Sequence, residues 1–223
     1  MSKRFYAAFV PLLAVAAFAA MPATSQAAFH WYACLKHAGT GEKFSDSECQ
    51  KPLTTGVWEW ERLPFTSAKT QVITFGKLTL HMSNGIVIEC KKVDAGNIWN
   101  VTEATFGQDN VEVFVNYECK SEQCATFSIT AKSLPWSTEL AAGPVDKIKG
   151  IELTMNCAGT ELTLKGELSP KVVNSTETEP LFEEFTAATG ELEEPVTKLK
   201  VSVVGRDRML GFEYGEDIRV KNP

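Results

Sequence analysis

Beyond its first 27 residues, the sequence has no segment longer than a turn or two in which apolar residues recur at helical spacing. Parallel α/β folds need helices to connect their strands, so this absence excludes them. The sequence also lacks a Gly-x-Ser-x-Gly motif, and Gly39-Thr-Gly41 is too short to form a dinucleotide-binding or phosphate-binding loop. Neither a nucleophile-elbow hydrolase nor a nucleotide-binding enzyme is therefore predicted.

Metal ligands and excess positive charge are also scarce. The three histidines, His30, His37 and His81, show no ligand spacing, and neither a Cys-x-x-Cys pair nor the Asp-x-Asp-x-Asp-Gly pattern of calcium loops occurs. The sequence thus predicts no metal site and no cofactor. With 22 Lys and Arg against 28 Asp and Glu, the net charge is −6, which argues against nucleic acid and anionic membrane surfaces as partners.

A long apolar run occurs at the beginning of the chain, where about 17 residues from Phe5 to Met21 follow Lys3 and Arg4 and precede Ser25-Gln26-Ala27. A basic start, an apolar centre and small residues at a cleavage site are typical of a secretory signal peptide. An uncleaved membrane anchor is the alternative, but the run is at or below the roughly 20 residues that span a bilayer. We expect cleavage after residue 27, which removes two basic and no acidic residues and leaves 196 residues with a net charge of −8 and no transmembrane segment.

The six cysteines all lie beyond this segment, and an even number in an exported chain favours three disulfides in a protein that is secreted or associated with the cell envelope. From loop lengths and strand ends, the expected pairs are Cys34 with Cys49, Cys119 with Cys124, and Cys90 with Cys157. The last pair closes the longest loop and is expected to stabilise the fold most, by about 4 kcal/mol.

Alternation of apolar and polar residues dominates the rest of the chain. Residues 77–82 and 86–90 alternate on either side of Asn84-Gly85, which is a strong hairpin signal because both turn residues take positive φ. Further hairpins are expected from residues 111–118 with 125–132, 151–155 with 161–164, and 198–204 with 209–212. Many short strands separated by frequent turns predict an all-β fold, an antiparallel β-sandwich or barrel.

The first part of the mature chain looks different from the rest. Residues 28–66 contain one expected local cystine, three of the five tryptophans and few alternating runs. We expect a small cystine-closed N-terminal lobe at 28–66, too short for a core of its own, followed by the antiparallel β-domain at 67–223. The alternative is that residues 28–66 form the first edge of that same domain.

Much of the mature chain resembles exported proteins of uncharacterised function from soil actinobacteria. The resemblance lies in Phe29-His-Trp-Tyr-Ala-Cys34, Phe44-Ser-Asp-Ser-Glu-Cys49, Leu78, Asn84-Gly85, Ile88-Glu-Cys90, Tyr117-Glu-Cys119, Cys124, Met155-Asn-Cys157-Ala-Gly159 and Lys165-Gly166-Glu-Leu-Ser-Pro170. It implies a shared cystine scaffold and brings no known activity, ligand or catalytic residue with it.

Trp58 and Trp60 are the candidate ligand-binding residues, because they alternate with Glu59 and Glu61 and so occupy one face of a short strand. Exposed, they would form a platform on which a sugar stacks; the alternative is that they are the buried face of that strand. No residue is predicted to be catalytic.

Pairs of carboxylates at about 5–10 Å are what glycosidases use. The pairs close in sequence are Glu59 with Glu61, Glu183 with Glu184, and Glu213 with Glu216 and Asp217. We expect a non-catalytic exported β-domain that binds an extracellular or envelope ligand, for which carbohydrate is one candidate. A secreted carboxylate-dependent hydrolase and a purely structural or adhesive surface protein are the alternatives.

Overall fold

The computed structural model describes residues 28–36, 43–66, 68–174, 181–212 and 217–221. The predicted signal peptide, His37, Glu213 and Glu216 lie outside these residues. Within them, the secondary structure consists of strands: β1 (His30–Lys36), β2 (Trp58–Arg62), β3 (Thr70–Met82), β4 (Val87–Trp99), β5 (Gln108–Lys120), β6 (Phe127–Lys132), β7 (Trp136–Ala141), β8 (Val145–Cys157), β9 (Thr160–Leu168), β10 (Lys171–Val173), β11 (Phe182–Phe185), β12 (Glu191–Glu193), β13 (Lys200–Gly211) and β14 (Ile218–Lys221).

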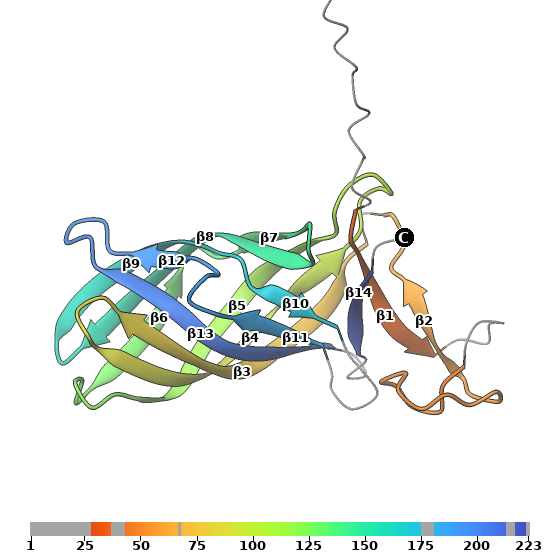
Figure 1. The fold of residues 1–223 in the computed structure, drawn as a ribbon, viewed down its shortest axis with the longest axis horizontal. Coiled ribbons are helices and arrows are strands. Elements are labelled where there is room, and N and C mark those ends of the chain that lie inside the picture. Colours follow the sequence, from red (N-terminus) through yellow and green to blue (C-terminus); the bar gives the residue numbers. More distant parts are fainter. Residues whose placement is uncertain (1–27, 37–42, 67, 175–180, 213–216, 222–223) are drawn as a thin grey trace, which may run out of the picture.

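The main body is an antiparallel β-barrel, which confirms the predicted fold class (Figure 1). The five long strands β3, β4, β5, β8 and β13 take part in two closed rings of hydrogen-bonded strands, one toward each end of the barrel. Toward the β3–β4 hairpin the ring is completed by β6, β9 and β12, and toward the other end by β7, β10 and β11. Pairing of β13 with β3 closes both rings, which therefore have eight strands each.

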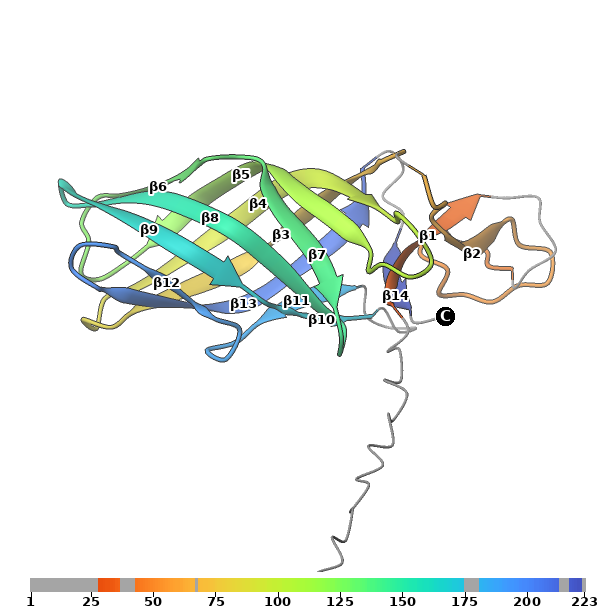
Figure 2. The same cartoon turned by 90° about the horizontal axis from the view of Figure 1, so that it is seen from above.

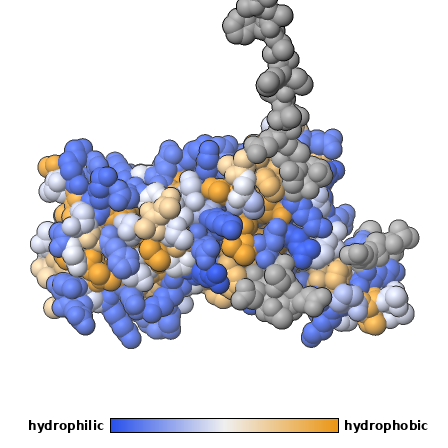
Figure 3. Space-filling view, viewed as in Figure 1, coloured by the Kyte–Doolittle hydropathy of each residue, from blue (hydrophilic) through white to orange (hydrophobic). Residues whose placement is uncertain are grey.

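Side-chain alternation explains why this sequence forms the barrel. On β3, Leu78, Leu80 and Met82 are buried inside, whereas Lys77 and His81 at alternate positions are exposed. The predicted hairpin after β3 is present, with Gly85 at a φ of 91°, a conformation that glycine adopts without strain. The outer wall is correspondingly rich in hydrophilic side chains, with smaller apolar areas between them (Figure 3).

A β-bulge changes this alternation on β5. Ala95 and Gly96 on β4 face Val113 and Val111, so Glu112 is the extra residue. Beyond the bulge the two faces of β5 are exchanged: Val113 and Val115 are exposed on the outer wall, and Phe114 lines the interior.

The disulfide pairing predicted from the sequence is correct for Cys34–Cys49 and wrong for the other two bonds. The structure has Cys90–Cys119 and Cys124–Cys157 instead. Cys90 and Cys119 lie on the neighbouring strands β4 and β5, and β6 places Cys157 on β8 close to the turn that holds Cys124. Between β4 and β8 lie β5 and β6, so Cys90 and Cys157 have no strand pairing that would bring them together.

The N-terminal residues form a small lobe at one end of the barrel (Figure 2). Its sheet has the order β14-β1-β2, so the last strand of the chain belongs to it, beyond the boundary expected at residue 66. Trp31 of β1 is fully buried among Ile98, Leu140 and Met209 of the barrel. The lobe and the barrel thus share one apolar cluster, which covers this end of the barrel interior.

Candidate functional site

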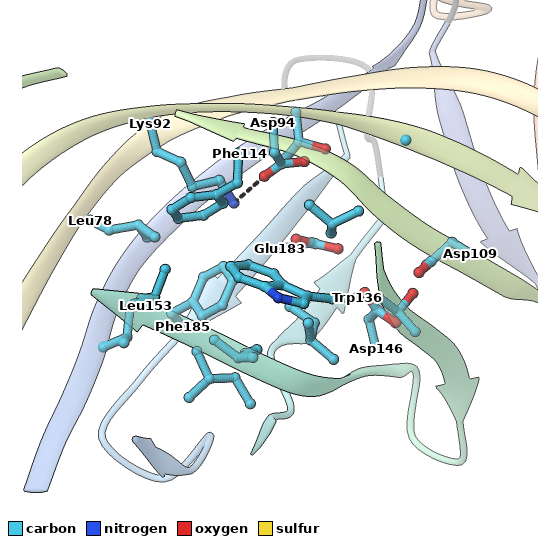
Figure 4. Close-up of a pocket in the computed structure, with 18 of the residues that line it drawn as sticks. Leu78, Lys92, Asp94, Asp109, Phe114, Trp136, Asp146, Leu153, Glu183 and Phe185 are labelled. Atoms are coloured by element: carbon cyan, nitrogen blue, oxygen red, sulfur yellow. Dashed lines mark ion pairs between the residues drawn. The ribbon is translucent and has the colours of Figure 1, made fainter. Parts of the chain in front are cut away.

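The barrel contains a cavity of about 60 Å³ (Figure 4). Both apolar clusters contribute to its lining: the cluster next to the lobe with Val72 and Met209, and the cluster nearer the β3–β4 hairpin with most of its buried residues. A single water needs about 10–15 Å³, so the cavity has room for only a few. Its lining extends along β3 from Val72 to Leu80, a distance of about 25 Å at the usual rise per residue. The lining residues are therefore spread over most of the length of β3.

The two ends of the cavity differ chemically. Asp94, Asp109, Asp146, Glu183 and Thr138 line the part nearer the lobe. The part nearer the hairpin is apolar and is lined by Leu78, Leu80, Ile148, Ile151, Leu153, Leu168, Phe185, Leu192 and Val203. A molecule that fills the cavity from one end to the other would meet polar groups at its head and hydrocarbon along its tail.

Lys92 lies where these two parts meet, with its ammonium group paired inside the protein. Its Nζ is 2.6 Å from Asp94 Oδ2, and it donates a hydrogen bond to Asp207 Oδ2. The rings of Phe114 and Phe185 have their centroids 5.7 and 5.5 Å from the same nitrogen. Burial lowers the pKa of Lys92, but the charges of Asp207 and Asp94 outweigh it and hold the pKa above its usual value. Lys92 is thus a bound cation rather than a nucleophile, because a reactive amine needs a lowered pKa.

Three further carboxyl groups share the polar end. Burial raises the pKa values of Asp109, Asp146 and Glu183 well above the usual carboxyl range, and neighbouring negative charges raise each of them further. The three carboxyls are hydrogen-bonded in series: Glu183 donates to Asp146, and Asp146 donates to Asp109. The hydroxyl of Thr138 hydrogen-bonds to Asp146, and when all three carboxyls are ionised, Oδ2 of Asp109 and Oδ1 of Asp146 have no hydrogen-bond donor.

These raised pKa values predict that stability falls as the pH rises. The native state holds protons on Asp109, Asp146 and Glu183 that the unfolded chain releases near pH 4. The stability that these protons provide is complete below that pH. It is lost as the pH rises through the pKa values of the native state, by about 1.4 kcal/mol per pH unit for each proton. Urea denaturation at pH 5 and at pH 8 measures how much the free energy of unfolding falls between these two pH values. We expect a smaller fall for Asp146→Asn than for the native protein.

The matched control for this measurement is Glu61→Gln, which changes an exposed carboxyl on β2 and should leave the decrease unchanged. Glu89, Glu139, Glu152 and Glu194 act in the opposite direction, because hydrogen bonds lower their pKa values, and their contribution is lost only below about pH 4.5. If the free energy of unfolding fell equally with pH in Asp146→Asn and in the native protein, proton uptake at this site would be contradicted.

The cavity approaches the surface between β5 and β6. All lining residues are buried except Asn110, Val111, Phe114, Asn116 and Ile129, which come from these two strands and are partly exposed. The ladder between β5 and β6 has one register pair, Val115 with Thr130. The disulfides tie β5 to β4 and the β5–β6 connection to β8, so no cystine crosses this part of the wall.

The tryptophans predicted to bind a ligand lie in the lobe, away from this cavity. Trp58 and Trp60 are partly buried and pack against the cluster of Phe44 and the Cys34–Cys49 disulfide. The guanidinium of Arg219 lies 4.1 Å from the centroid of the Trp60 ring and covers one of its faces. Both residues keep part of their surface exposed, so binding of a ligand by Trp58 and Trp60 stays a prediction.

Within the part of the chain that the structure describes, the carboxylate pairs close in sequence are not brought together at the cavity. Glu183 lines the interior, whereas Glu184 next to it points outward and accepts hydrogen bonds from Arg206. Asp217 is fully buried, and Glu59 and Glu61 lie on β2 of the lobe. Strand alternation separates adjacent residues onto opposite faces, so neighbours in sequence rarely form a pair in a barrel.

Sequence reasoning missed five of the six charged residues of the barrel interior: Lys92, Asp94, Asp109, Asp146 and Asp207. A signal for them was present. On β4, Lys92 and Asp94 alternate in step with the apolar residues Ile88 and Cys90 and so lie on the same face of the strand. On β13, Asp207 lies on the same face as Val203. A charged residue at a position that alternation assigns to the interior is the exception that marks a possible site.

Among the described residues, no group of three or more His, Cys, Asp or Glu side chains is placed to hold a metal ion. Across the same residues, no helix is long and apolar enough to cross a membrane. Three disulfides and no free cysteine among the described residues are typical of an oxidising compartment. Compared with known proteins, the chain matches no protein-family model, no curated protein and no solved structure.

Proposed function

We propose that this protein is an exported, non-catalytic binding protein that holds a small, largely apolar molecule inside its barrel. The observation that supports it most is the cavity inside the barrel, with a polar end and an apolar end. Small-molecule sites are typically apolar with a few placed polar groups, and the mouths and interiors of β-barrels are common places for them. The cystine scaffold, the apolar N-terminal segment and the resemblance to exported actinobacterial proteins support the location outside the cytoplasm or in the cell envelope.

A carboxylate-dependent hydrolase is the second candidate, because buried carboxyls with raised pKa values in one cavity are a pattern of general acids. The size of the cavity argues against a sugar substrate. Ligand pockets usually measure about 300–1,000 Å³, and this cavity is far smaller. Binding of a slender molecule needs no wider space, which is why we favour it over hydrolysis of a glycoside.

The proposed function is tested with 1-hexanol as the probe and the mature, oxidised protein. Trp136 lines the cavity and donates its indole N–H to Lys132 O, so its indole resonance reports on the interior. That resonance is identified by its absence in Trp136→Phe. We expect a saturable shift during titration, and at least tenfold weaker binding in Leu153→Phe, which fills the apolar end.

The control for this titration is Val113→Phe, which adds the same ring on the outer wall, where Val113 is 50% exposed. This variant should bind 1-hexanol like the native protein. A shift that does not saturate, or one that Leu153→Phe leaves unchanged, would place the probe outside the cavity and refute the proposal.

A further inference from the structure

We propose that the molecule held in the cavity is an unbranched primary amine, with its ammonium head among Asp109, Asp146 and Thr138 and its alkyl chain along the apolar end. This inference rests on the proposed function and names the ligand class for the same cavity. Three independent properties of the site lead to it: its shape, its charge and its unfilled hydrogen-bonding capacity.

The shape selects a single chain. A volume of about 60 Å³ is spread along a lining that reaches from Val72 to Leu80 on β3 and from Asp146 to Leu153 on β8. A ring or a branched skeleton needs width, and buried side chains line the cavity everywhere except between β5 and β6. An extended hydrocarbon chain needs length and little width, so it suits this lining better than a ring does.

The charge selects a cation over an anion. Lys92 is the cation that an anionic head group would seek, but Asp94 and Asp207 already neutralise it. Asp109, Asp146 and Glu183 add three more buried carboxyls without a second buried cation among the residues that line the cavity. A fatty carboxylate would add another negative charge to this group, whereas an ammonium compensates one.

The unfilled acceptors match an ammonium group. With the carboxyls ionised, Oδ2 of Asp109 and Oδ1 of Asp146 are buried and lack a donor, and the hydroxyl of Thr138, which donates to Asp146, can still accept through Oγ1. Their residues are 5%, 2% and 4% exposed, and all three line the cavity. A primary ammonium carries three N–H donors, one for each of these oxygens. An alcohol has a single donor and would leave at least two of them unfilled.

Binding of an ammonium is expected to depend on pH. The ionisable groups that surround the head position are Lys92 and Asp94 on β4, Asp109 on β5, Asp146 on β8, Glu183 on β11 and Asp207 on β13. Protons held by Asp109, Asp146 and Glu183 must leave before these carboxyls can accept from an ammonium. Affinity for the amine should therefore increase from pH 5 to pH 8, while affinity for a neutral alcohol should not.

The test compares n-hexylamine, 1-hexanol and hexanoate, which share one chain and differ in the head group, by the Trp136 indole resonance at pH 7.5. We expect n-hexylamine to bind at least tenfold more tightly than 1-hexanol, and hexanoate to bind more weakly than either. Asp146→Asn should lower the ratio of amine to alcohol affinity at least fivefold. Glu89→Gln, which changes an exposed carboxyl of the outer wall, should leave the ratio unchanged.

The outcomes separate this inference from the function on which it rests. Equal affinity for the amine and the alcohol, or a preference for hexanoate, would overturn the amine inference and leave the binding function standing. Absence of binding for all three would overturn both. A preference for the amine that Asp146→Asn does not reduce would place the ammonium elsewhere on this acidic protein and would also overturn the inference.

Discussion

Replacing Lys92 with methionine is expected to lower the free energy of unfolding at pH 7 by about 3–5 kcal/mol. Methionine fills a similar volume among Phe114 and Phe185, so the loss comes from charge rather than from a cavity. Without the ammonium, Asp94 and Asp207 remain buried with no cation between them. Urea denaturation followed by tryptophan fluorescence measures the change.

Lys91→Met is the matched control for this prediction. Lys91 is the next residue of β4, points outward and pairs with Glu118 at 2.6 Å in solvent, where such a pair contributes about 0–1 kcal/mol. If Lys92→Met is too unstable to fold, adding Asp207→Asn should restore part of the stability by removing one unpaired charge. Similar small losses for Lys91→Met and Lys92→Met would show that the interior ion pairs are not held as described.

Removing Cys124–Cys157 by the double change to alanine should lower the free energy of unfolding by about 4 kcal/mol. The bond links residues 33 apart in sequence, and the loop it closes restricts the unfolded chain. Removing Cys34–Cys49, with a separation of 15, should cost less, about 3 kcal/mol. Urea denaturation of the two variants provides the comparison.

The variant that lacks Cys124 and Cys157 also tests which cysteines are bonded to each other. Cys90 and Cys119 remain bonded to each other when Cys124 and Cys157 are replaced, so thiol titration in denaturant should find no free cysteine. Under the pairing predicted from the sequence, both of the remaining partners would be free. Detection of two thiols per chain would therefore contradict the structure.

The fold class was predictable because most of the long strands carry a local signal, although residues 198–212, which were expected to form a hairpin, contain the single strand β13. Residues 77–90 contain alternation, a turn dipeptide and alternation again, and these features act within the hairpin without help from distant residues. The choice between sandwich and barrel was not available from such signals. It depends on the pairing of β13 with β3, two strands that are far apart in sequence and meet only when the whole sheet has curved round.

The cystine pairing failed for a related reason. Cys119 and Cys124 are separated by a short polar segment, and a tight β5–β6 hairpin was the simplest structure for it. In the protein β5 and β6 diverge, and the strands beside them supply the partners. Loop length alone cannot predict which strand lies on the other side of a given cysteine.

The candidate site was only partly accessible to sequence reasoning. Glu183 was singled out, but with Glu184 as its partner, although alternation places the two on opposite faces. Its actual neighbours in the cavity, Asp109 and Asp146, come from β5 and β8. The alternation along a single strand was enough to predict that a charged residue faces the interior. It could not predict that these charged residues meet in one cavity, because that depends on how the strands of the closed barrel pair with one another.

The closing strands of the barrel set a condition on when the protein can fold. A chain that emerges with its N-terminus first can form the β3–β4 hairpin early, but β3 gains its second neighbour only when β13 is complete at Gly211. Asp207 arrives on that same strand, so Lys92 lacks one of its two counter-ions until then. The lobe waits longer still, because β1 needs β14 from the end of the chain. Nearly the whole polypeptide must therefore be present before the barrel can close, so the folding of this protein waits on contacts between its most distant strands.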